Sequence, residues 1–216
     1  MNVFVLGASG RTGRLLARTL LARGDRVSGL VRREEQRAEL AALGVDASVG
    51  ALAGATAETL APLLRGADAV VFAAGSNAGA REVTAAVDGQ AVVETLAAAR
   101  LADVDRFLLL SVLPEAGRGQ RPDEDEEFYF AVKKLVDVTV TLSDLDWVVL
   151  RPSLLVDRPG TGQVALGPAQ PDDEIPRADV AATLAELLHE PRVRRQLLEV
   201  TQGSTPVAQA VRATIR

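Results

Sequence analysis

The feature that most constrains this chain is a glycine-rich turn close to its start, residues 7–13 (GASGRTG). A hydrophobic run, residues 3–6 (VFVL), leads straight into the turn, and a helical pattern follows at once. A strand, a glycine-rich turn and a helix in this order suit the pyrophosphate of a nucleotide, because the unpaired N–H groups and the positive dipole end of the helix face the anion. We therefore expect a dinucleotide to lie across this turn, in contact with Gly7, Ser9, Gly10, Arg11, Thr12 and Gly13.

The spacing of the three glycines, G-x-x-G-x-x-G, differs from the commoner G-x-G-x-x-G. In a chain with 18 glycines such a pattern is weak evidence on its own, and a plain loop is the alternative. Its position directly between a strand and a helix favours nucleotide binding. The sequence contains no Gly-Lys-Ser or Gly-Lys-Thr, which argues against a P-loop kinase or NTPase.

Composition narrows the classes of function. A length of 216 residues suits a single domain, residues 1–216, with a substantial core. The net charge of −5 argues against nucleic acid or an anionic membrane as a partner. A chain with no cysteine and one histidine cannot build a thiolate or histidine-rich metal site. Without a signal-peptide pattern or a run of about 18 apolar residues, we expect a cytoplasmic protein that makes no membrane contact.

Hydrophobic runs and helical patterns alternate along the rest of the chain. The expected strands after the first are residues 26–31, 45–49, 68–75, 106–112, 147–150 and 197–200. The expected helices after the first are residues 34–43, 56–64, 81–100, 123–142, 177–189 and a last one from Pro206. This alternation predicts an α/β fold with right-handed βαβ units, a parallel sheet and helices on both faces. Residues 152–176 are rich in proline and glycine, and we expect them to form a lid or substrate-facing stretch.

The end of the second strand indicates which nicotinamide cofactor is favoured, because ligands of such a sheet bind at the carboxyl ends of its strands. This strand ends in Arg32 and Arg33, and acidic residues follow only where the next helix begins. An acidic residue here binds the ribose of NAD, whereas arginine pairs with the 2′-phosphate of NADP. The two arginines favour NADP(H), with Arg11 as a further positive group; the alternative is that they are merely solvated.

Tyr129 and Lys133 lie four residues apart in an expected helix and therefore share one of its faces. A phenol has an ordinary pKa of about 10, and a nearby ammonium lowers that pKa, which allows proton transfer to or from a substrate oxygen. Tyr129 is the only tyrosine, and Lys133 and Lys134 are the only lysines. This composition favours a catalytic or cofactor-linked pair over the alternative, an ordinary helix surface.

Three more strand ends carry residues suited to the nicotinamide side of a cofactor site. A serine there can hydrogen-bond a substrate carbonyl, although it can also simply end the strand. Small residues let a ribose or a nicotinamide lie against the backbone. The residues concerned are Ser111, then Ala73, Ala74 and Gly75, and finally Pro152, Ser153 and Leu154.

The remaining polar clusters have simpler explanations. The acidic run at residues 123–127 suits the start of a helix, where negative charge complements the dipole, better than a metal site. His189 lies at a helix end, and we expect it to be a C-terminal cap rather than a metal ligand. Arg177 and Asp179 begin a helix; capping is the simple account, and contact with an acidic substrate is the alternative.

Taken together, these features resemble the short-chain dehydrogenase/reductase superfamily, in its atypical, NmrA-like NAD(P)H-binding branch. The motifs that carry the resemblance are residues 7–13 (GASGRTG), 30–33 (LVRR), 71–75 (VFAAG), 129–133 (YFAVK), 146–152 (DWVVLRP) and 175–181 (IPRADVA). The resemblance implies a three-layer, Rossmann-type, doubly wound sheet of seven parallel strands in the order 3-2-1-4-5-6-7. It also implies a small C-terminal region on the substrate side.

In active members of that superfamily the matching tyrosine is the acid–base residue, the matching lysine binds the nicotinamide ribose and lowers the tyrosine pKa, and a serine steadies the substrate. The resemblance implies these roles for Tyr129, Lys133 and Ser111. Many relatives carry an acidic residue after the third strand that contacts adenine, and here Ala51 and Leu52 take that place.

We therefore predict an NADPH-dependent reductase of a small carbonyl, quinone or flavin-like acceptor. The alternatives are a non-catalytic regulator that senses NADP(H), and a sugar-nucleotide epimerase or dehydratase, which normally needs a larger C-terminal domain. The long helices at residues 81–100 and 123–142 offer faces for a homodimer. The shape of the acceptor pocket depends on the loop after Pro152 and on residues 114–122.

Overall fold

The computed structural model describes residues 1–76, 78–114 and 123–216. The strands are β1 (Asn2–Leu6), β2 (Arg26–Val31), β3 (Asp46–Val49), β4 (Ala69–Phe72), β5 (Arg106–Leu110), β6 (Asp146–Pro152), β7 (Leu154–Val156), β8 (Gln163–Gly167), β9 (Glu174–Pro176), β10 (Gln196–Gln202) and β11 (Thr205–Pro206). The helices are α1 (Arg11–Ala22), α2 (Glu34–Ala41), α3 (Ala57–Leu64), α4 (Arg81–Val83), η1 (Thr84–Gln90), α5 (Ala91–Leu101), α6 (Glu124–Thr141), α7 (Arg177–His189) and α8 (Val207–Ala213).

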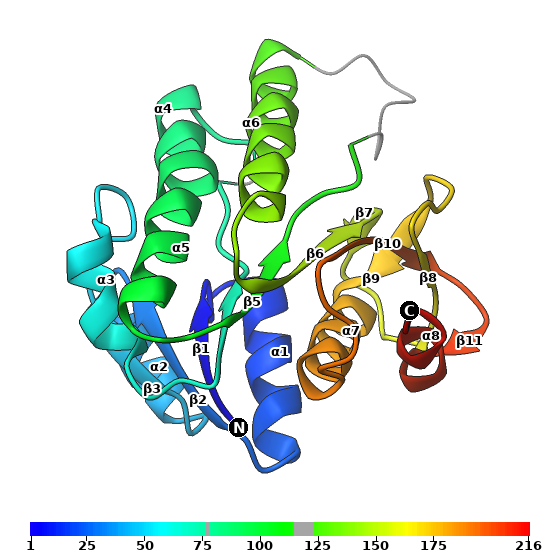
Figure 1. Ribbon diagram of the computed structural model, residues 1–216, viewed down its shortest axis with the longest axis horizontal. Coiled ribbons are helices and arrows are strands. Elements are labelled where there is room, and N and C mark those ends of the chain that lie inside the picture. Colours follow the sequence, from blue (N-terminus) through cyan, green and yellow to red (C-terminus); the bar gives the residue numbers. More distant parts are fainter. Residues whose placement is uncertain (77, 115–122) are drawn as a thin grey trace.

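The described strands build one main sheet in the order β11-β8-β10-β6-β5-β4-β1-β2-β3 (Figure 1). Seven of them, from β3 across to β10, are mutually parallel. This arrangement confirms the predicted doubly wound sheet and its strand order, with β10 as the seventh strand. From β1 the chain first adds strands on one side, to β3, and then crosses to add β4 and later strands on the other side. Folds of this kind bind their ligands at this switch point between β1 and β4.

The proline- and glycine-rich stretch contains strands that the sequence pattern did not indicate. β8 pairs antiparallel with β10 and extends the main sheet, and β11, which lies beyond this stretch, pairs antiparallel with β8. β7 and β9 pair with each other in a separate two-stranded sheet. Residues 152–176 are therefore partly an extension of the sheet edge, where short strands tolerate prolines nearby.

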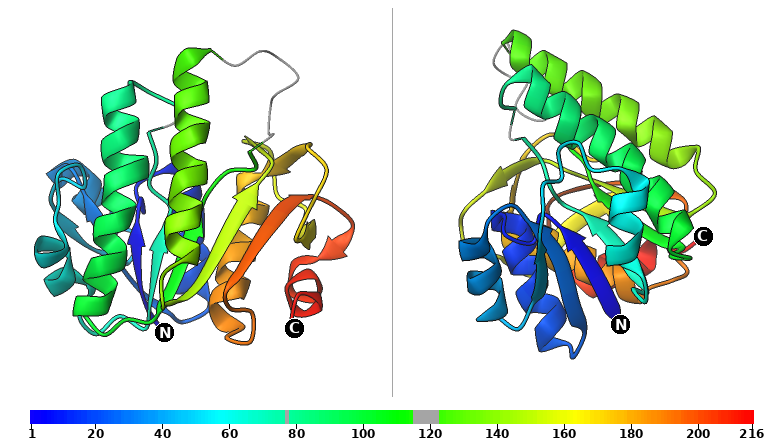
Figure 2. Two further views of the ribbon diagram at one scale, coloured as in Figure 1. Left: turned by 45° about the horizontal axis from the view of Figure 1, so that its top comes forward. Right: turned by 90° about the vertical axis from the view of Figure 1, so that its left-hand side faces the viewer.

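Helices cover both faces of the sheet (Figure 2). The central strands β1, β4 and β5 are almost entirely buried, which explains their continuous hydrophobic runs. One core cluster joins the sheet to α1, α2 and α7, and it includes Leu16, Leu20, Leu40, Leu184 and Leu188. The other joins it to α3, α5 and α6, and it includes Leu60, Leu64, Val92, Leu96, Val136 and Val140. The predicted three-layer organisation is confirmed.

The helix expected at residues 81–100 is interrupted by a π-helical segment. Its chain path runs through α4, the seven-residue π-helix η1 and α5 without a break. A π-turn holds one residue more than an α-turn and occurs often at functional sites. In η1, Asp88 is fully buried, at 0% exposure, although a helix of this composition was expected to be regular.

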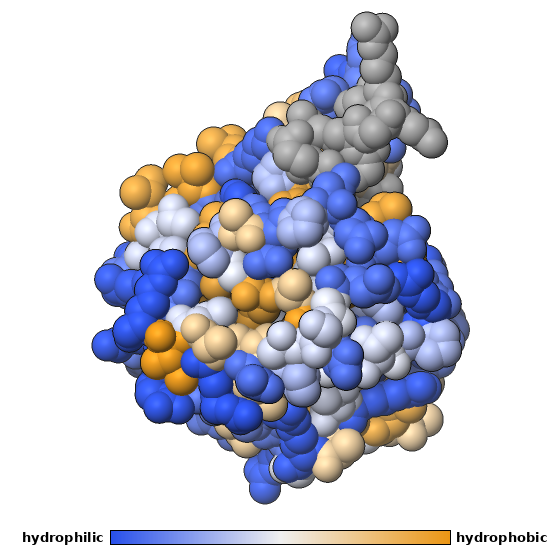
Figure 3. All heavy atoms as spheres, turned by 90° about the vertical axis from the view of Figure 1, so that its right-hand side faces the viewer, coloured by the Kyte–Doolittle hydropathy of each residue, from blue (hydrophilic) through white to orange (hydrophobic). Residues whose placement is uncertain are grey.

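Several large apolar side chains remain exposed on the outer helices: Val93 and Leu101 of α5, and Leu135, Val138 and Leu142 on or just after α6. The homodimer expected through these helices stays a prediction. On the face seen in Figure 3, apolar patches are separated by hydrophilic surface. Among the described helices none is both long and apolar enough to cross a membrane.

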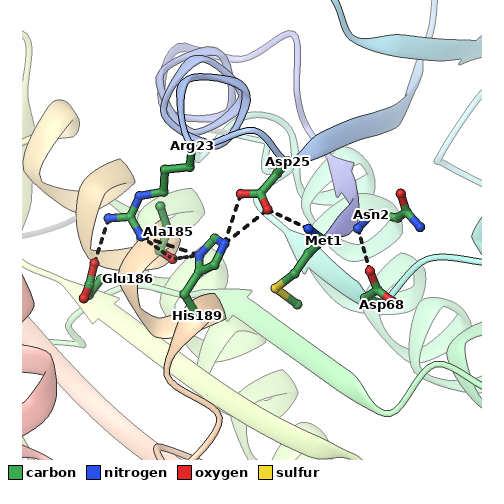
Figure 4. A network of polar contacts seen from close by, with 8 residues as sticks. All are labelled: Met1, Asn2, Arg23, Asp25, Asp68, Ala185, Glu186 and His189. Atoms are coloured by element: carbon green, nitrogen blue, oxygen red, sulfur yellow. Dashed lines mark hydrogen bonds and ion pairs between the residues drawn. The ribbon is translucent and has the colours of Figure 1, made fainter.

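A polar network ties the end of α7 to the turn between α1 and β2 (Figure 4). His189 Nδ1 lies 2.8 Å from the Ala185 carbonyl oxygen in the last turn of its own helix, and Nε2 lies 3.1 Å from Asp25 Oδ1. The amine of Met1 donates to Asp25 Oδ1 at 2.8 Å. The predicted contact of His189 with its helix end is confirmed, and the same ring also connects two distant segments.

Asp25 titrates abnormally because of these partners. Burial of the carboxyl opposes its ionisation, but the hydrogen bonds from the Met1 amine and from His189 outweigh burial and lower the pKa of Asp25. A lowered pKa in the folded state contributes stability above the unfolded pKa of about 3.9, and that stability is lost as pH falls through the folded pKa.

We expect Asp25→Asn to lower the free energy of unfolding by about 1–3 kcal/mol at neutral pH, because it weakens buried, charge-assisted hydrogen bonds. Urea unfolding followed by circular dichroism measures this, and the difference from the wild type should shrink below about pH 4. Asp68→Asn is the matched control, since Asp68 is exposed and accepts one bond from Asn2 N. Equal losses in the two variants would contradict the role of Asp25.

Candidate cofactor and substrate site

The glycine turn brings β1 against the end of β4. Gly7 has φ +92°, and a Cβ built there would lie 2.6 Å from Ala74 N, so a larger residue would collide with backbone. A Cβ on Gly13 would collide with the Gly7 carbonyl oxygen, which instead accepts a hydrogen bond from Gly10 N at 2.9 Å. The glycines therefore allow a close approach of three backbone segments at the switch point of the sheet.

The first turn of α1 is suited to an anion. Gly10 precedes it without a side-chain cap, and the first turn carries no acidic residue. Thr12 is buried beside it, while Arg11 is exposed and pairs with Asp157 Oδ2 at 2.6 Å. Unpaired N–H groups, the helix dipole and the adjacent guanidinium together fit a pyrophosphate.

Gln36 joins the glycine turn to the end of β2, and sequence reasoning missed it. Its Oε1 accepts from Arg32 N at 3.1 Å, and its Nε2 donates to Ser9 Oγ at 3.4 Å. In the described part of the chain the Arg32 guanidinium has no ion pair, and Arg33 Nε lies 4.0 Å from Glu35. Ser9 and the two arginines thus lie together at one edge of the turn, with positive charge available for a phosphate.

An open hollow of about 450 Å³ lies at the carboxyl ends of β2 and β3. Leu30, Leu60 and Leu63 form its apolar side, and residues 48–51 and 53–55 complete it. Ala51 is among these residues, whereas Leu52 is half-buried and packs on the core below. A flat apolar group such as adenine fits this lining, and the alanine leaves room where an acidic residue would stand.

The small residues after β4 lie between the glycine turn and η1. Ala73 N donates to Leu6 O at 2.8 Å, which continues the sheet up to the turn. Ser76 N donates to Asp88 Oδ2 at 2.9 Å, and a Cβ on Gly75 would lie 3.1 Å from Asp88 Oδ1. The π-helix thereby places a buried carboxylate directly beside the predicted nicotinamide side of the site.

Lys133 points to this carboxylate. Its Nζ lies 3.5 Å from Asp88 Oδ1, donates to Leu110 O at 3.2 Å and lies 6.0 Å from the centre of the Tyr129 ring. Lys133 is 3% exposed, so its ammonium needs these partners. The structure brings the predicted tyrosine and lysine together and adds Asp88, which the helical pattern gave no reason to place inside.

The expected lowering of the tyrosine pKa is wrong for this state of the molecule. Burial raises the pKa of the Tyr129 phenol well above its ordinary value, and the carboxyls of Asp88 and Asp137 raise it further. Asp88 pairs with Lys133, so its negative charge offsets much of the effect by which the ammonium would lower the tyrosine pKa. Tyr129 is therefore a protonated phenol at neutral pH.

Ser111 follows β5 and is buried, and its N–H donates to Leu150 O at 2.8 Å, next to Arg151. Burial raises the pKa of Asp137, against the opposing effects of the Ser111 hydroxyl and the Arg151 guanidinium. Arg151 Nε donates to Asp137 Oδ2 at 2.7 Å. Asp137 lies on the same helix as Tyr129 and Lys133, and it connects that pair to Ser111 after β5 and to Arg151 of β6.

The residues after β6 are engaged with the proline- and glycine-rich stretch. Ser153 is 1% exposed, donates to the Asp173 carbonyl and accepts from Asp173 N at 2.7 Å. Pro152 is also buried, and Leu154 is exposed. Cofactor contacts of these three residues stay a prediction, and the Ser153 hydroxyl is committed to positioning the 172–173 turn.

Asp179 has a structural role that differs from a simple helix cap. Its carboxylate accepts hydrogen bonds from Thr161 N at 2.9 Å and from Gly162 N at 2.8 Å. It therefore holds the turn that leads into β8. Arg177 pairs with Asp157 at 2.8 Å, which brings it to the same carboxylate as Arg11.

The acidic run at the start of α6 caps that helix, as predicted. Asp123 accepts hydrogen bonds from Asp125 N and Glu126 N, and Glu126 reaches back to Asp123 N. The described residues contain no group of three or more side chains placed to hold a metal ion. Most of the 114–122 loop, from residue 115 on, lies outside the described residues.

Comparison with known proteins gives matches along the whole chain. The sequence profile of the NAD(P)H-binding family matches residues 7–191. The chain is 32% identical over 214 residues to the uncharacterized sugar epimerase YhfK of Bacillus subtilis, covering 98% of this chain and 99% of YhfK. A putative NAD-dependent epimerase/dehydratase from Bacillus halodurans superposes with a TM-score of 0.87 at 31% identity, covering 99% of both chains.

A third relative has a reductase name. ChuY, an anaerobillin reductase from Escherichia coli O157:H7, superposes with a TM-score of 0.78 at 25% identity, covering 94% of this chain and 97% of its own. These matches extend well beyond the glycine turn and include the helices and strands that form the site. The chain therefore belongs to the NAD(P)H-binding family, in the atypical short-chain dehydrogenase/reductase group of reductases and epimerase-like proteins.

Proposed function

We propose that this protein is an NADPH-dependent reductase of a small carbonyl, quinone or flavin-like acceptor. One observation carries the proposal: the half-buried Tyr129 phenol, which keeps its proton at neutral pH, stands with the paired Lys133 near the ends of the central strands. A phenol in that state is a proton donor, which is the group that reduction of a carbonyl requires.

The chain's own residues divide the work of such a reaction. The bound cofactor supplies a hydride from its nicotinamide ring. Tyr129 donates a proton to the acceptor oxygen as negative charge develops there, and Lys133 stabilises the resulting phenolate. Lys133, held by Asp88 and the Leu110 carbonyl, would bind a ribose hydroxyl of the cofactor, and Ser111 would contact the acceptor.

Two relatives have names that include an epimerase, so an epimerase-like activity is the second candidate. An epimerase of this type first removes a proton from a substrate hydroxyl, which needs Tyr129 as a phenolate. The raised pKa of Tyr129 disfavours that first step at neutral pH. The name of ChuY, a reductase, agrees with the reductive direction.

The cofactor is proposed to be NADP(H) rather than NAD(H). Arg32 and Arg33 are exposed at the end of β2, where they would pair with a 2′-phosphate. Gln36 holds the backbone of Arg32 against Ser9, so this edge of the site is ordered before a ligand arrives. The apolar hollow beside it would take the adenine.

Titration of Tyr129 tests its protonation state directly, since it is the only tyrosine. We expect phenolate absorbance in the near ultraviolet to appear only above the ordinary pKa of about 10. Asp88→Asn should lower this pKa, because it removes one of the negative charges that oppose the phenolate. Asp125→Asn, on the exposed start of α6, is the matched control. A titration unchanged by Asp88→Asn would contradict the effect of Asp88.

Tyr129→Phe should lower kcat roughly 10²- to 10⁴-fold on any acceptor that the wild type reduces, because the proton donor is lost. NADPH oxidation against quinones, flavins and aldehydes measures turnover, and fluorescence titration measures NADPH binding, which should survive. Phe128→Leu on the preceding helix position serves as the control. Retained turnover in Tyr129→Phe would remove Tyr129 from the mechanism, and tight NADPH binding without any turnover would favour a sensor.

Arg32→Ala with Arg33→Ala should weaken NADPH binding roughly 10- to 100-fold and leave NADH binding nearly unchanged, since only NADPH has the 2′-phosphate. Titration calorimetry with both cofactors measures the two affinities. Arg37→Ala is the control, because Arg37 is exposed on α2 and pairs with Glu34. Equal weakening of NADPH and NADH would rule out the 2′-phosphate contact.

A further inference from the structure

Asp137 is a buried carboxyl for which the proposed reaction has no use. It lies on α6 four residues after Lys133 and eight after Tyr129, so the three side chains share one helix face. Asp137 is only 2% exposed. A carboxylate at this depth is unfavourable unless it is paired and hydrogen-bonded, so its partners indicate its role.

One oxygen of Asp137 is fixed by a row of polar groups. Oδ2 accepts from Arg151 Nε at 2.7 Å, and Arg151 lies 4.0 Å from Glu199 Oε1. The other oxygen of Glu199 accepts from Gln170 N at 2.8 Å. The row runs from α6 through β6 and β10 to the 152–176 stretch, and it holds the Asp137 carboxylate in one orientation.

The second oxygen of Asp137 is available to bind Ser111. Oδ1 is buried without a hydrogen bond among the described residues, and Ser111 Oγ, 6% exposed, is buried likewise without one of good geometry. The two groups lie close together in the fold: Ser111 N donates to Leu150 O at 2.8 Å, and the next residue, Arg151, donates to Asp137. The Ser111 hydroxyl also opposes the rise in the pKa of the Asp137 carboxyl. A carboxylate only accepts, and a hydroxyl has one hydrogen to donate, so a bond between them uses the hydrogen of Ser111.

We propose that Asp137 is a positioning residue that engages the Ser111 hydrogen, so that Ser111 meets the acceptor as a hydrogen-bond acceptor. This proposal rests on the reductase function proposed above. It reverses the direction of the hydrogen bond expected of Ser111, which was a donor to a substrate carbonyl. Tyr129 is then the donor to the oxygen that is reduced.

The inference defines a chemical class of substrate. A molecule that satisfies Ser111 carries an O–H or N–H beside the group that is reduced, as in hydroxycarbonyl compounds, hydroxyquinones or N–H heterocycles. A methyl ether at the same position has no hydrogen to donate, so its oxygen would face the Ser111 oxygen without a hydrogen bond between them. A site built for a hydrogen bond discriminates strongly against an analogue that leaves its buried polar group unpaired.

The first test does not depend on turnover. The chain has no cysteine, so Ser111→Cys introduces a single thiol at this position. An adjacent carboxylate that accepts the S–H raises the thiol pKa above its ordinary value of about 8.5, as measured by thiolate absorbance against the wild type. Adding Asp137→Asn should lower that pKa. Adding Asp179→Asn instead should not, because Asp179 is equally buried, at 2% exposure, but belongs to α7.

The second test compares paired acceptors that differ by one methyl group, such as a hydroxyketone and its methyl ether. The wild type should prefer the hydroxyl compound roughly 10- to 100-fold in kcat/KM. In Asp137→Asn the amide oxygen faces Arg151 and the NH₂ donates to Ser111, whose hydrogen then points outward, so the preference should disappear. The pH profile of kcat/KM is recorded for both proteins.

The outcomes separate the two proposals. An unchanged thiol pKa in the Ser111→Cys, Asp137→Asn protein, or a hydroxyl preference that survives Asp137→Asn, would overturn the role of Asp137. Absence of turnover on every acceptor, together with a thiol pKa that responds to Asp137→Asn, would overturn the reductase function while the Asp137–Ser111 contact stands.

Discussion

The close approach of three backbone segments at Gly7 is the constraint on which the rest of the site depends. Because Gly7 lies against the backbone at Ala73 and Ala74, the chain stays close to the end of β4 as it leaves β1, at the point where a pyrophosphate would rest. The first turn of α1, the end of β2 and the small residues after β4 all open from this point. The groups proposed to bind the cofactor are arranged around this turn, so its position determines where the cofactor can lie.

Buried charge is the second organising element. Lys133, Asp88 and Asp137 are nearly inaccessible, and Arg151 and Glu199 extend the group toward the sheet edge. Removing such groups from water is unfavourable, and they persist because each has a partner in fixed geometry. Their arrangement determines protonation: the phenol stays neutral, and the lysine is paired before any ligand arrives. The phenol therefore carries its proton at neutral pH, which is the state from which the proposed reduction starts.

The alternation of strands and helices predicted the parallel α/β class and the glycine turn well, because both are local signals, whereas the strand order followed from the family resemblance. The sequence pattern missed β8 and β11, since nearby prolines and glycines obscure short edge strands. It also missed Asp88, Asp137 and Gln36, because a polar residue in a helical pattern reads as solvent-facing until its neighbours in space are known. The direction of the Tyr129 pKa shift was mispredicted for the same reason: burial of the phenol is its main cause, and the carboxyls of Asp88, on the π-helix, and of Asp137 add to it.

That π-helix has a consequence for how the site can vary among relatives. A π-turn is an α-turn with one residue inserted, and one residue corresponds to a rotation of about 100° around the helix axis. A relative with one residue fewer in this segment would keep the sheet, the glycine turn and the lysine. Its carboxylate would face a different direction, and its lysine would be free to act on the tyrosine. A single-residue difference in the length of this segment would therefore be enough to change the electrostatic character of the site.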